Sequence, residues 1–295
     1  MPTLLITGAG GQLGKEFAAL AHSFPKWHFL LPVRNELDIT DTTQIEDFFA
    51  NHQPDYCLNT AAYTAVDRAE QERDTAFSIN ATAAHQLATI CKKYNTHLFH
   101  YSTDYVYQSG INRPIQETDP TQPKSVYAAS KLAGDQMIGG ILPAATIIRT
   151  SWVYSSYGHN FVKTMLRLGQ ERPELRVVFD QVGTPTYAKD LALYTLQMIE
   201  KIEAGILEKD KLAGIFHFSN EGVCSWYDFA QAIFELTKIT CKVYPIESWE
   251  YPTPAQRPNY SVLNKAKIKK ASGINIPYWR EALERCLKEI NHQAS

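Results

Sequence analysis

The amino-acid sequence predicts an α/β protein with a doubly wound parallel sheet and a smaller, mixed α/β cap. Short apolar runs alternate with helical patterns over residues 1–150, which is typical of a parallel sheet covered by helices. A glycine-rich turn follows the first apolar run, and a tyrosine and a lysine stand four residues apart in a later helical run. The elements after residue 150 are shorter and mixed, which indicates a second unit that closes over the carboxyl edge of the sheet.

The first element expected is a buried strand over residues 3–7, because an apolar run there ends at glycines. Gly8, Gly11 and Gly14 follow at three-residue spacing, and a helical pattern begins directly after them. Strand, glycine turn and helix in this order indicate a dinucleotide-binding loop, since the N–H groups at a helix N-terminus face a pyrophosphate. The alternative is a plain turn with flexible glycines.

The second strand is expected over residues 27–33, and Arg34 follows it. A carboxylate at this point holds the ribose of NAD, whereas an arginine accommodates the 2′-phosphate of NADPH. Arg34 therefore favours NADPH, with a solvated loop charge as the alternative. Asp38 and Ile39 come where an adenine can lie, and the alternative for Asp38 is a carboxylate that caps a turn. Asp41 suits the N-cap of the helix that begins after it.

A third strand is expected over residues 55–59 and a fourth over residues 97–101. Between them lies a long helical stretch over residues 65–95, with a break expected near Asp74 as one alternative. Small residues after the third strand let a flat cofactor lie against the backbone. Ser102 and Thr103 follow the fourth strand, where a hydroxyl can hydrogen-bond a substrate carbonyl. The alternative is a hydroxyl that bonds only the local backbone.

A polar loop rich in proline and glycine over residues 108–124 is expected on the surface, as a connection or a lid. It leads into a helix that carries Tyr127 and Lys131. Residues four apart on a helix share a face, so the phenol and the ammonium can point at one spot. An ammonium there stabilises the phenolate and lowers the tyrosine pKa from its usual value of about 10. Such a tyrosine exchanges a proton near neutral pH; the alternative is an amphipathic surface pair.

The remaining chain alternates shorter elements, and Ser225 suits the N-cap of one of them. Strands are expected over residues 145–154, 175–181, 211–220 and 241–246, a turn over 182–186, and helices over 161–170, 188–202, 225–238 and 278–290. The predicted organisation is an NAD(P)-binding Rossmann domain interleaved with a substrate-binding domain. The first covers residues 1–150 plus about 188–215, and the second covers about 151–187 plus 216–295.

The composition is that of an ordinary globular protein. The chain has 295 residues, 44% apolar and 20% charged, and a formal net charge of -2, so nothing indicates nucleic-acid or membrane binding. The first residues are too short an apolar run for a signal peptide, and no run is long enough to span a membrane. The five cysteines are scattered, which favours reduced thiols in a cytoplasmic protein over a disulfide frame or a metal site.

These motifs together resemble the extended short-chain dehydrogenase/reductases. Within that superfamily, the chain is similar to the dTDP-4-dehydrorhamnose reductase family over nearly its whole length. The matching runs are GGQLG (10–14), ELDITD (36–41), NTAAYTAVDRAE (59–70), YSTDYVY (101–107), YAASKLAG (127–134), RTSWVYS (149–155), GHNFV (158–162), DQVGTPTYAKDLA (180–192) and RPNYSVLN (257–264). The glycine loop and Tyr-x-x-x-Lys are shared widely, whereas YSTDYVY, RTSWVYS and DQVGTPTYA are far more specific to this family.

The resemblance implies NAD(P)H-dependent reduction of the C4 ketone of dTDP-4-dehydro-L-rhamnose. It implies that Tyr127 donates the proton, Lys131 holds the nicotinamide ribose and Thr103 bonds the carbonyl oxygen. Asp104 and Trp152, with Thr103, are expected to contact the sugar nucleotide. The cofactor is expected to be NADPH or NADH, bound by Gly8, Gly11, Gln12, Leu13, Gly14, Arg34, Asp38, Ile39, Ala61, Ala62, Tyr63, Tyr101, Tyr127 and Lys131.

Some members of this family dimerise through Mg²⁺ held by glutamates at the interface. Glu16 stands where one such carboxylate would come, with Asp190 and Glu289 as approximate matches to the others, although an exposed helix glutamate is the favoured interpretation of Glu16. Mg²⁺ and the choice between monomer and homodimer stay open. Asn160 and Arg257 are candidates for the substrate diphosphate.

Two other classes fit part of the pattern. An epimerase or epimerase-reductase of sugar nucleotides needs a further acid–base residue opposite Tyr127, for which Cys224 and His159 are the nearest candidates. A non-catalytic dinucleotide-binding protein, like the regulatory subunit of methionine adenosyltransferase, needs no proton relay. Here Thr103, Tyr127 and Lys131 are all present.

Overall fold

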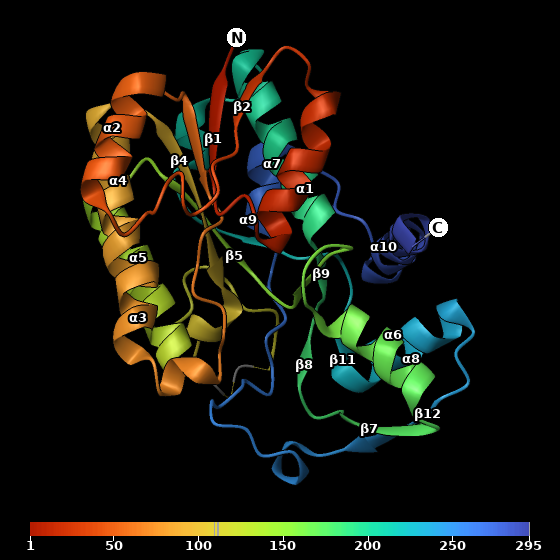
Figure 1. The fold of residues 1–295 in the computed structure, drawn as a ribbon. Helices are drawn as coiled ribbons and strands as arrows, with labels where there is room; N and C mark the ends of the chain where they lie inside the picture. Colours follow the sequence, from red (N-terminus) through yellow and green to blue (C-terminus); the bar gives the residue numbers. More distant parts are fainter. Residues whose placement is uncertain (109, 111, 295) are drawn as a thin grey trace.

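The computed structural model describes residues 1–108, 110 and 112–294, and its centre is a six-stranded parallel sheet (Figure 1). The strand order is β10-β5-β4-β3-β1-β2. β2 lies on one side of β1, whereas β3 and the strands that follow it in this sheet lie on the other. Such a reversal of strand order opens a ligand site outside the carboxyl ends of β1 and β3. The predicted sheet is confirmed. Its strands are β1 Thr3–Thr7, β2 His28–Leu30, β3 Tyr56–Asn59, β4 His97–Thr103, β5 Thr146–Thr150 and β10 Gly214–Phe218.

Helices cover both faces of this sheet, as the doubly wound topology requires. One face packs against α2, α4 and α5 around a core that includes Phe49 and Leu87, and the other packs against α1 and α7 around Phe17 and Leu196 (Figure 1). The long helical stretch predicted over residues 65–95 is divided by irregular turns. The helices are α1 Gln12–Leu20, α2 Thr42–His52, α3 Arg73–Phe77, α4 Ala83–Lys93, α5 Val126–Ile141, α7 Ala188–Glu203 and α9 Ala266–Ser272.

Shorter elements from the second half of the chain form a separate core around Tyr154, Phe229 and Ile233. Two-stranded sheets pair β6 with β9, β7 with β12 and β8 with β11, and α10 closes this part of the molecule at the C-terminal end (Figure 1). Its elements are β6 Val153–Tyr154, α6 Phe161–Glu171, β7 Glu174–Val178, β8 Val182–Gly183, β9 Thr186–Tyr187, β11 Cys224–Ser225, α8 Trp226–Thr237, β12 Lys242–Ile246 and α10 Trp279–Ala294.

Three details differ from the sequence prediction. The strand expected over residues 145–154 is broken at Trp152, whose φ of +48° is incompatible with a continuous strand. The turn expected over residues 182–186 contains the short strands β8 and β9. The helix α9 was not expected from the sequence. The N-caps at Asp41 and Ser225 are confirmed, since each side chain accepts a hydrogen bond from the first turn of its helix.

Residues 109 and 111 of the surface loop predicted over residues 108–124 lie outside the described residues. The remaining part of the loop is tied down by backbone hydrogen bonds, from Gln108 N to Pro120 O and from Ile115 N to Val262 O. Within the described ranges, no helix combines the length and apolar character needed to cross a bilayer.

Candidate active site

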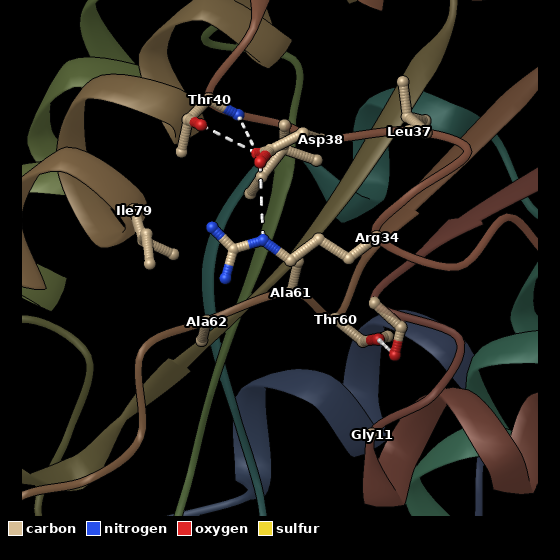
Figure 2. A pocket seen from close by; sticks show the side chains of 11 residues that line it. Gly11, Arg34, Leu37, Asp38, Thr40, Thr60, Ala61, Ala62 and Ile79 are labelled. Atoms are coloured by element: carbon tan, nitrogen blue, oxygen red, sulfur yellow. Dashed lines mark hydrogen bonds and ion pairs between the residues drawn. The ribbon is translucent and has the colours of Figure 1, made fainter. Parts of the chain in front are cut away.

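A cleft of ≈ 230 Å³ lies at the point where the sheet reverses, above the carboxyl ends of β1 and β3 (Figure 2). Glycines, small residues and one exposed arginine form its walls, so a flat ligand can approach the backbone closely. The lining residues are Gly8, Gly11, Arg34, Leu37, Asp38, Ile39, Thr40, Thr60, Ala61, Ala62 and Ile79.

The glycine turn has the close approaches that a dinucleotide loop needs. Gly8 has a φ of +68°, and a Cβ there would lie 2.7 Å from the backbone of Ala61. A Cβ on Gly14 would lie 2.4 Å from the Gly8 carbonyl oxygen, so this glycine lets α1 pack tightly on β1. The N-cap Gly11 offers no side-chain acceptor, which leaves N–H groups of the first turn of α1 available to an anion. The turn therefore fits a pyrophosphate.

Arg34 and Asp38 lie together at the mouth of the cleft. Arg34 Nε is 3.3 Å from Asp38 Oδ2, and the arginine side chain is 77% exposed. Asp38 Oδ1 also accepts hydrogen bonds from the Thr40 backbone N–H (2.9 Å) and hydroxyl (2.7 Å), and these bonds hold the pKa of Asp38 below its ordinary value. Asp38 thus caps a turn and also lines the cleft, and its contact with an adenine stays a prediction.

Thr103 ends β4 beside the helix that carries Tyr127. The Thr103 hydroxyl accepts from the Tyr105 backbone N–H and lies 3.2 Å from Asp104 Oδ1. Desolvation raises the pKa of Tyr127 to about 12, and a hydrogen bond with Thr103 opposes the rise. The structure therefore brings the predicted hydroxyl and phenol into one place.

Lys131 lies one helical turn beyond Tyr127 and is buried. Its ammonium donates to the Tyr101 carbonyl oxygen at 2.7 Å and lies 3.3 Å from His100 Nε2. Burial lowers the pKa of Lys131 to about 8, while the carboxylate of Asp135 opposes this shift. The predicted net lowering of the Tyr127 pKa is wrong for this structure, because desolvation of the phenol dominates and the Lys131 ammonium donates to the Tyr101 carbonyl.

The other predicted substrate residues are Asp104, which follows Thr103 directly, and Trp152. Asp104 is buried, its Oδ2 has no hydrogen-bond partner among the described residues, and burial raises its pKa to about 7. The Trp152 ring stacks on that of Trp226, with centroids 3.7 Å apart and planes 10° apart. Trp226 also lines a larger groove of ≈ 690 Å³ together with Arg172, Arg176 and Arg257. Glu174 and Glu250 line the same groove, and Glu250 pairs with Arg176. The aromatic ring and the other two arginines suit a nucleoside diphosphate.

The diphosphate candidates already have protein partners. Arg257 forms a two-pronged ion pair with Asp67, from NH2 to Oδ2 at 2.7 Å and from NH1 to Oδ1 at 3.1 Å. Asn160 caps α6 and donates to Gln12 Oε1 at 2.9 Å. Gln12 therefore links the glycine turn to the loop before α6.

Two tyrosines predicted to bind cofactor have hydroxyls engaged elsewhere. Tyr63 donates to Glu72 at 2.6 Å, and Tyr101 donates to Thr195 at 3.1 Å. Tyr101 contributes instead through its carbonyl, which holds Lys131. Leu13 packs against the sheet core.

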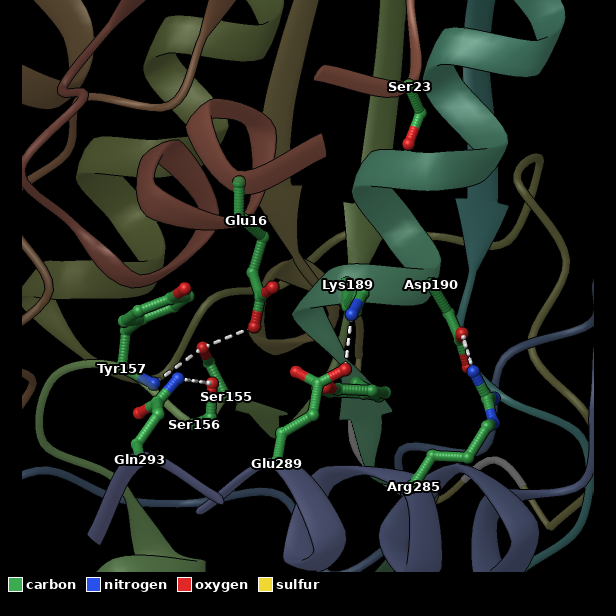
Figure 3. A network of polar contacts seen from close by, with 12 residues as sticks. Glu16, Ser23, Ser155, Ser156, Tyr157, Lys189, Asp190, Arg285, Glu289 and Gln293 are labelled. Carbon is green, nitrogen blue, oxygen red and sulfur yellow. Dashed lines mark hydrogen bonds and ion pairs between the residues drawn. The ribbon is translucent and has the colours of Figure 1, made fainter. Parts of the chain in front are cut away.

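Glu16 is fully buried, which contradicts the interpretation of an exposed helix glutamate (Figure 3). Its Oε1 accepts from the Ser155 hydroxyl at 2.6 Å, and its Oε2 has no hydrogen-bond partner in the described part of the chain. Burial raises its pKa to about 7. The carboxyl lies inside the molecule because α1 is covered there by the loop that carries Ser155.

The three carboxylates named as metal ligands do not fit a Mg²⁺ site. Glu289 pairs with the ammonium of Lys189, and Asp190 pairs with both Arg285 nitrogens at 2.7 Å (Figure 3). These partners already supply the positive charge that a cation would bring. Across residues 1–108, 110 and 112–294, no group of three or more histidine, cysteine, aspartate or glutamate side chains is placed to hold a metal.

Lys131 is surrounded by buried polar residues that were not expected from the sequence. These are Thr7, Asn59, His100, Asp135 and Arg149. Thr7 and Asn59 are the final residues of β1 and β3, and a polar residue that ends a buried strand was the available signal. Asp135 stands four residues after Lys131 on α5, but its partner Arg149 lies on β5.

Comparison with known proteins gives one consistent result. The family described as "RmlD substrate binding domain" matches residues 2–292. The dTDP-4-dehydrorhamnose reductase of Aggregatibacter actinomycetemcomitans is 41% identical over 290 residues, covering 96% of this chain and 98% of the relative. The spore coat polysaccharide biosynthesis protein SpsK of Bacillus subtilis (strain 168) is 40% identical over 289 residues, covering 98% of each.

A solved structure shares the fold over almost the entire length. The dTDP-4-dehydrorhamnose reductase of Bacillus anthracis str. Ames, in complex with NADP, superposes with a TM-score of 0.90 at 38% identity. The match covers 98% of this chain and 99% of that one.

Proposed function

The chain belongs to the RmlD substrate binding domain family, and from this membership and its site we propose that it reduces the C4 ketone of dTDP-4-dehydro-L-rhamnose to dTDP-L-rhamnose with NAD(P)H. The observation that carries the proposal is the hydrogen bond between Thr103 and Tyr127, one helical turn from the buried ammonium of Lys131. Ketone reduction needs an acid and a hydrogen-bond partner for the carbonyl oxygen at one place.

The cleft residues give each part of the cofactor a partner. The glycine turn holds the pyrophosphate at the N-terminus of α1, Asp38 and Ile39 meet the adenine, and Ala61 and Ala62 let the dinucleotide lie flat. When bound, the nicotinamide supplies the hydride that reaches C4. We propose NADPH as the preferred form, because the exposed Arg34 can pair with a 2′-phosphate.

The protein groups handle the proton. Tyr127 gives its phenolic proton to the alkoxide that forms at C4, and the Thr103 hydroxyl donates to the same oxygen. Lys131 holds the nicotinamide ribose and stabilises the phenolate left on Tyr127. Asp104 and the stacked Trp152 contact the sugar, and the groove beside Trp226 accepts the thymidine diphosphate.

The organisation proposed from the sequence agrees with these roles. The cofactor half comprises residues 1–150 plus about 188–215, and the substrate half comprises about 151–187 plus 216–295. All five cysteines are free thiols, which supports a reducing compartment, the cytoplasm. We propose a monomer or a homodimer that needs no Mg²⁺, because Lys189 and Arg285 already pair with the candidate ligands.

The test is a coupled assay with purified protein, NADPH and enzymatically generated dTDP-4-dehydrorhamnose, followed by absorbance at the nicotinamide band. Oxidation that depends on the sugar nucleotide is the expected result. Absence of oxidation, when cofactor binding has been demonstrated by fluorescence, would reject the reductase and favour a dinucleotide-binding partner protein.

An epimerase activity has less support. Burial raises the pKa of the Cys224 thiol far above its ordinary value, so this thiol is a poor proton acceptor at neutral pH. Product analysis by NMR of the recovered sugar nucleotide distinguishes reduction at C4 from inversion at C3 or C5.

A further inference from the structure

A row of buried polar side chains crosses the sheet directly behind Lys131. Thr7, Asn59 and His100 are register neighbours on β1, β3 and β4, so their side chains share one face. The Thr7 hydroxyl lies 2.7 Å from Asn59 Oδ1, Asn59 Nδ2 lies 3.0 Å from His100 Nδ1, and His100 Nε2 lies 3.3 Å from Lys131 Nζ. All four residues are at most 2% exposed.

The polar character of this row is not a requirement of the fold. Two residues earlier on the same strands and the same face, the register neighbours are Leu5, Cys57 and Leu98, which pack in the apolar core under α5. Buried polar groups are unfavourable unless each is hydrogen-bonded. The change from an apolar row to a fully connected polar row occurs at the level of Lys131, which indicates that the lysine is what the row serves.

Resting on the proposed reductase function, we propose that His100 is a positioning residue for Lys131, which it holds in its charged form and aims at the cofactor. An ammonium only donates, so His100 Nε2 accepts from it, and Nδ1 carries the ring proton. The orientation of an amide is assigned from its hydrogen-bond network. This tautomer requires Asn59 to present its oxygen to Nδ1 and its nitrogen to Thr7, which reverses the arrangement in which Oδ1 lies next to Thr7 and Nδ2 next to His100. The Tyr101 carbonyl takes a second N–H at 2.7 Å, and the third is left for the ribose hydroxyls and Tyr127.

The charged groups around His100 agree with this assignment. Burial and the Lys131 ammonium hold the pKa of His100 well below its ordinary value, so the ring is neutral and able to accept. Asp135 Oδ1 lies 3.9 Å from His100 Nε2, and Asp135 Oδ2 accepts from Arg149 Nε at 2.9 Å. The Asp135 carboxyl thus has Arg149 as its partner, while the imidazole supplies the neutral acceptor for the lysine.

The experiment compares His100→Leu, His100→Gln and a matched control, His97→Leu, which removes another buried histidine from the same strand. Initial rates with NADPH and the sugar nucleotide are measured from pH 6 to 9, and NADPH binding is measured without the sugar. For His100→Leu we expect kcat to fall about 10- to 100-fold, the strength of a hydrogen bond to a charged group. The alkaline limb of its pH–rate profile should move to lower pH. Without the His100 acceptor the charged form of Lys131 is less stable, so the lysine loses its proton at a lower pH.

Glutamine retains an acceptor oxygen, so His100→Gln should keep the alkaline limb within half a pH unit of wild type, and His97→Leu should not move it. The proposal would be overturned if the alkaline limb of His100→Leu stayed at the wild-type pH. It would also be overturned if His97→Leu shifted the limb by the same amount. Should His100→Leu not fold, Asn59→Leu replaces it, since it removes the partner of Nδ1; an unmoved limb there also overturns the role. Failure of the wild-type protein to oxidise NADPH rejects the reductase function instead, and the pH dependence of NADPH binding then tests His100 alone.

Discussion

Glu16 makes the stability of this protein fall as pH rises from about 4.5 to about 7. Its carboxyl is fully buried, and burial raises its pKa from 4.5 to about 7. Between these two values the unfolded chain has lost the proton while the folded protein keeps it, so the folded state is progressively disfavoured from about pH 4.5 to about pH 7. The difference corresponds to about 3 kcal/mol in the free energy of unfolding above this window.

Glu16→Gln tests this directly, because the amide resembles the protonated carboxyl and can still accept from the Ser155 hydroxyl. Urea unfolding of both proteins from pH 4.5 to 8 should show no difference at the acid end and a stabilisation of the variant of about 3 kcal/mol at pH 8. Glu171→Gln, at an exposed end of α6, is the control and should give no pH-dependent difference. A Glu16→Gln effect that is constant across the pH range would refute the assignment of a raised pKa.

Three further substitutions test the site and its support. Tyr127→Phe should bind NADPH normally, as measured by fluorescence, but its turnover should fall roughly 10²- to 10⁴-fold. Near-normal turnover would remove Tyr127 from the mechanism. Arg149→Met should cost about 3–5 kcal/mol in urea unfolding, since it leaves Asp135 charged and buried, whereas the double variant with Asp135→Leu should recover part of that loss. Arg34→Ser should raise KM for NADPH about tenfold and leave KM for NADH unchanged; equal effects on both cofactors would exclude a role in recognising the 2′-phosphate.

Patterns along the chain were sufficient for the sheet, the glycine turn and the capped helices. Asp41 and Ser225 cap the helices expected after them, because capping depends on residues only two or three positions apart. The close packing of Gly14 on the Gly8 carbonyl is also local, because both residues belong to one turn of seven residues. These features could be predicted because their causes are local.

The features missed have partners far away in the sequence. Asn59 and His100 are 41 residues apart, and Glu16 and Ser155 are 139 residues apart. A helical pattern placed Glu16 correctly on α1, but exposure of a helix face depends on what covers it, and here the loop at Ser155 does so. Likewise, Trp152 ends a strand through a positive φ that no residue-type preference indicates.

The error over Tyr127 shows how the two kinds of cause combine. The pairing of Tyr127 and Lys131 one helical turn apart predicted a lower tyrosine pKa, yet desolvation raises it to about 12 and leaves the lysine near 8. A raised tyrosine pKa suits ketone reduction, because the phenol must hold its proton until the alkoxide forms. An alkoxide is a far stronger base than a phenolate, so a tyrosine with a pKa of about 12 still donates readily. In the proposed reaction the lysine acts after the transfer, when its charge stabilises the phenolate. Loss of a group that keeps Lys131 charged should therefore lower turnover, but by less than loss of Tyr127 itself.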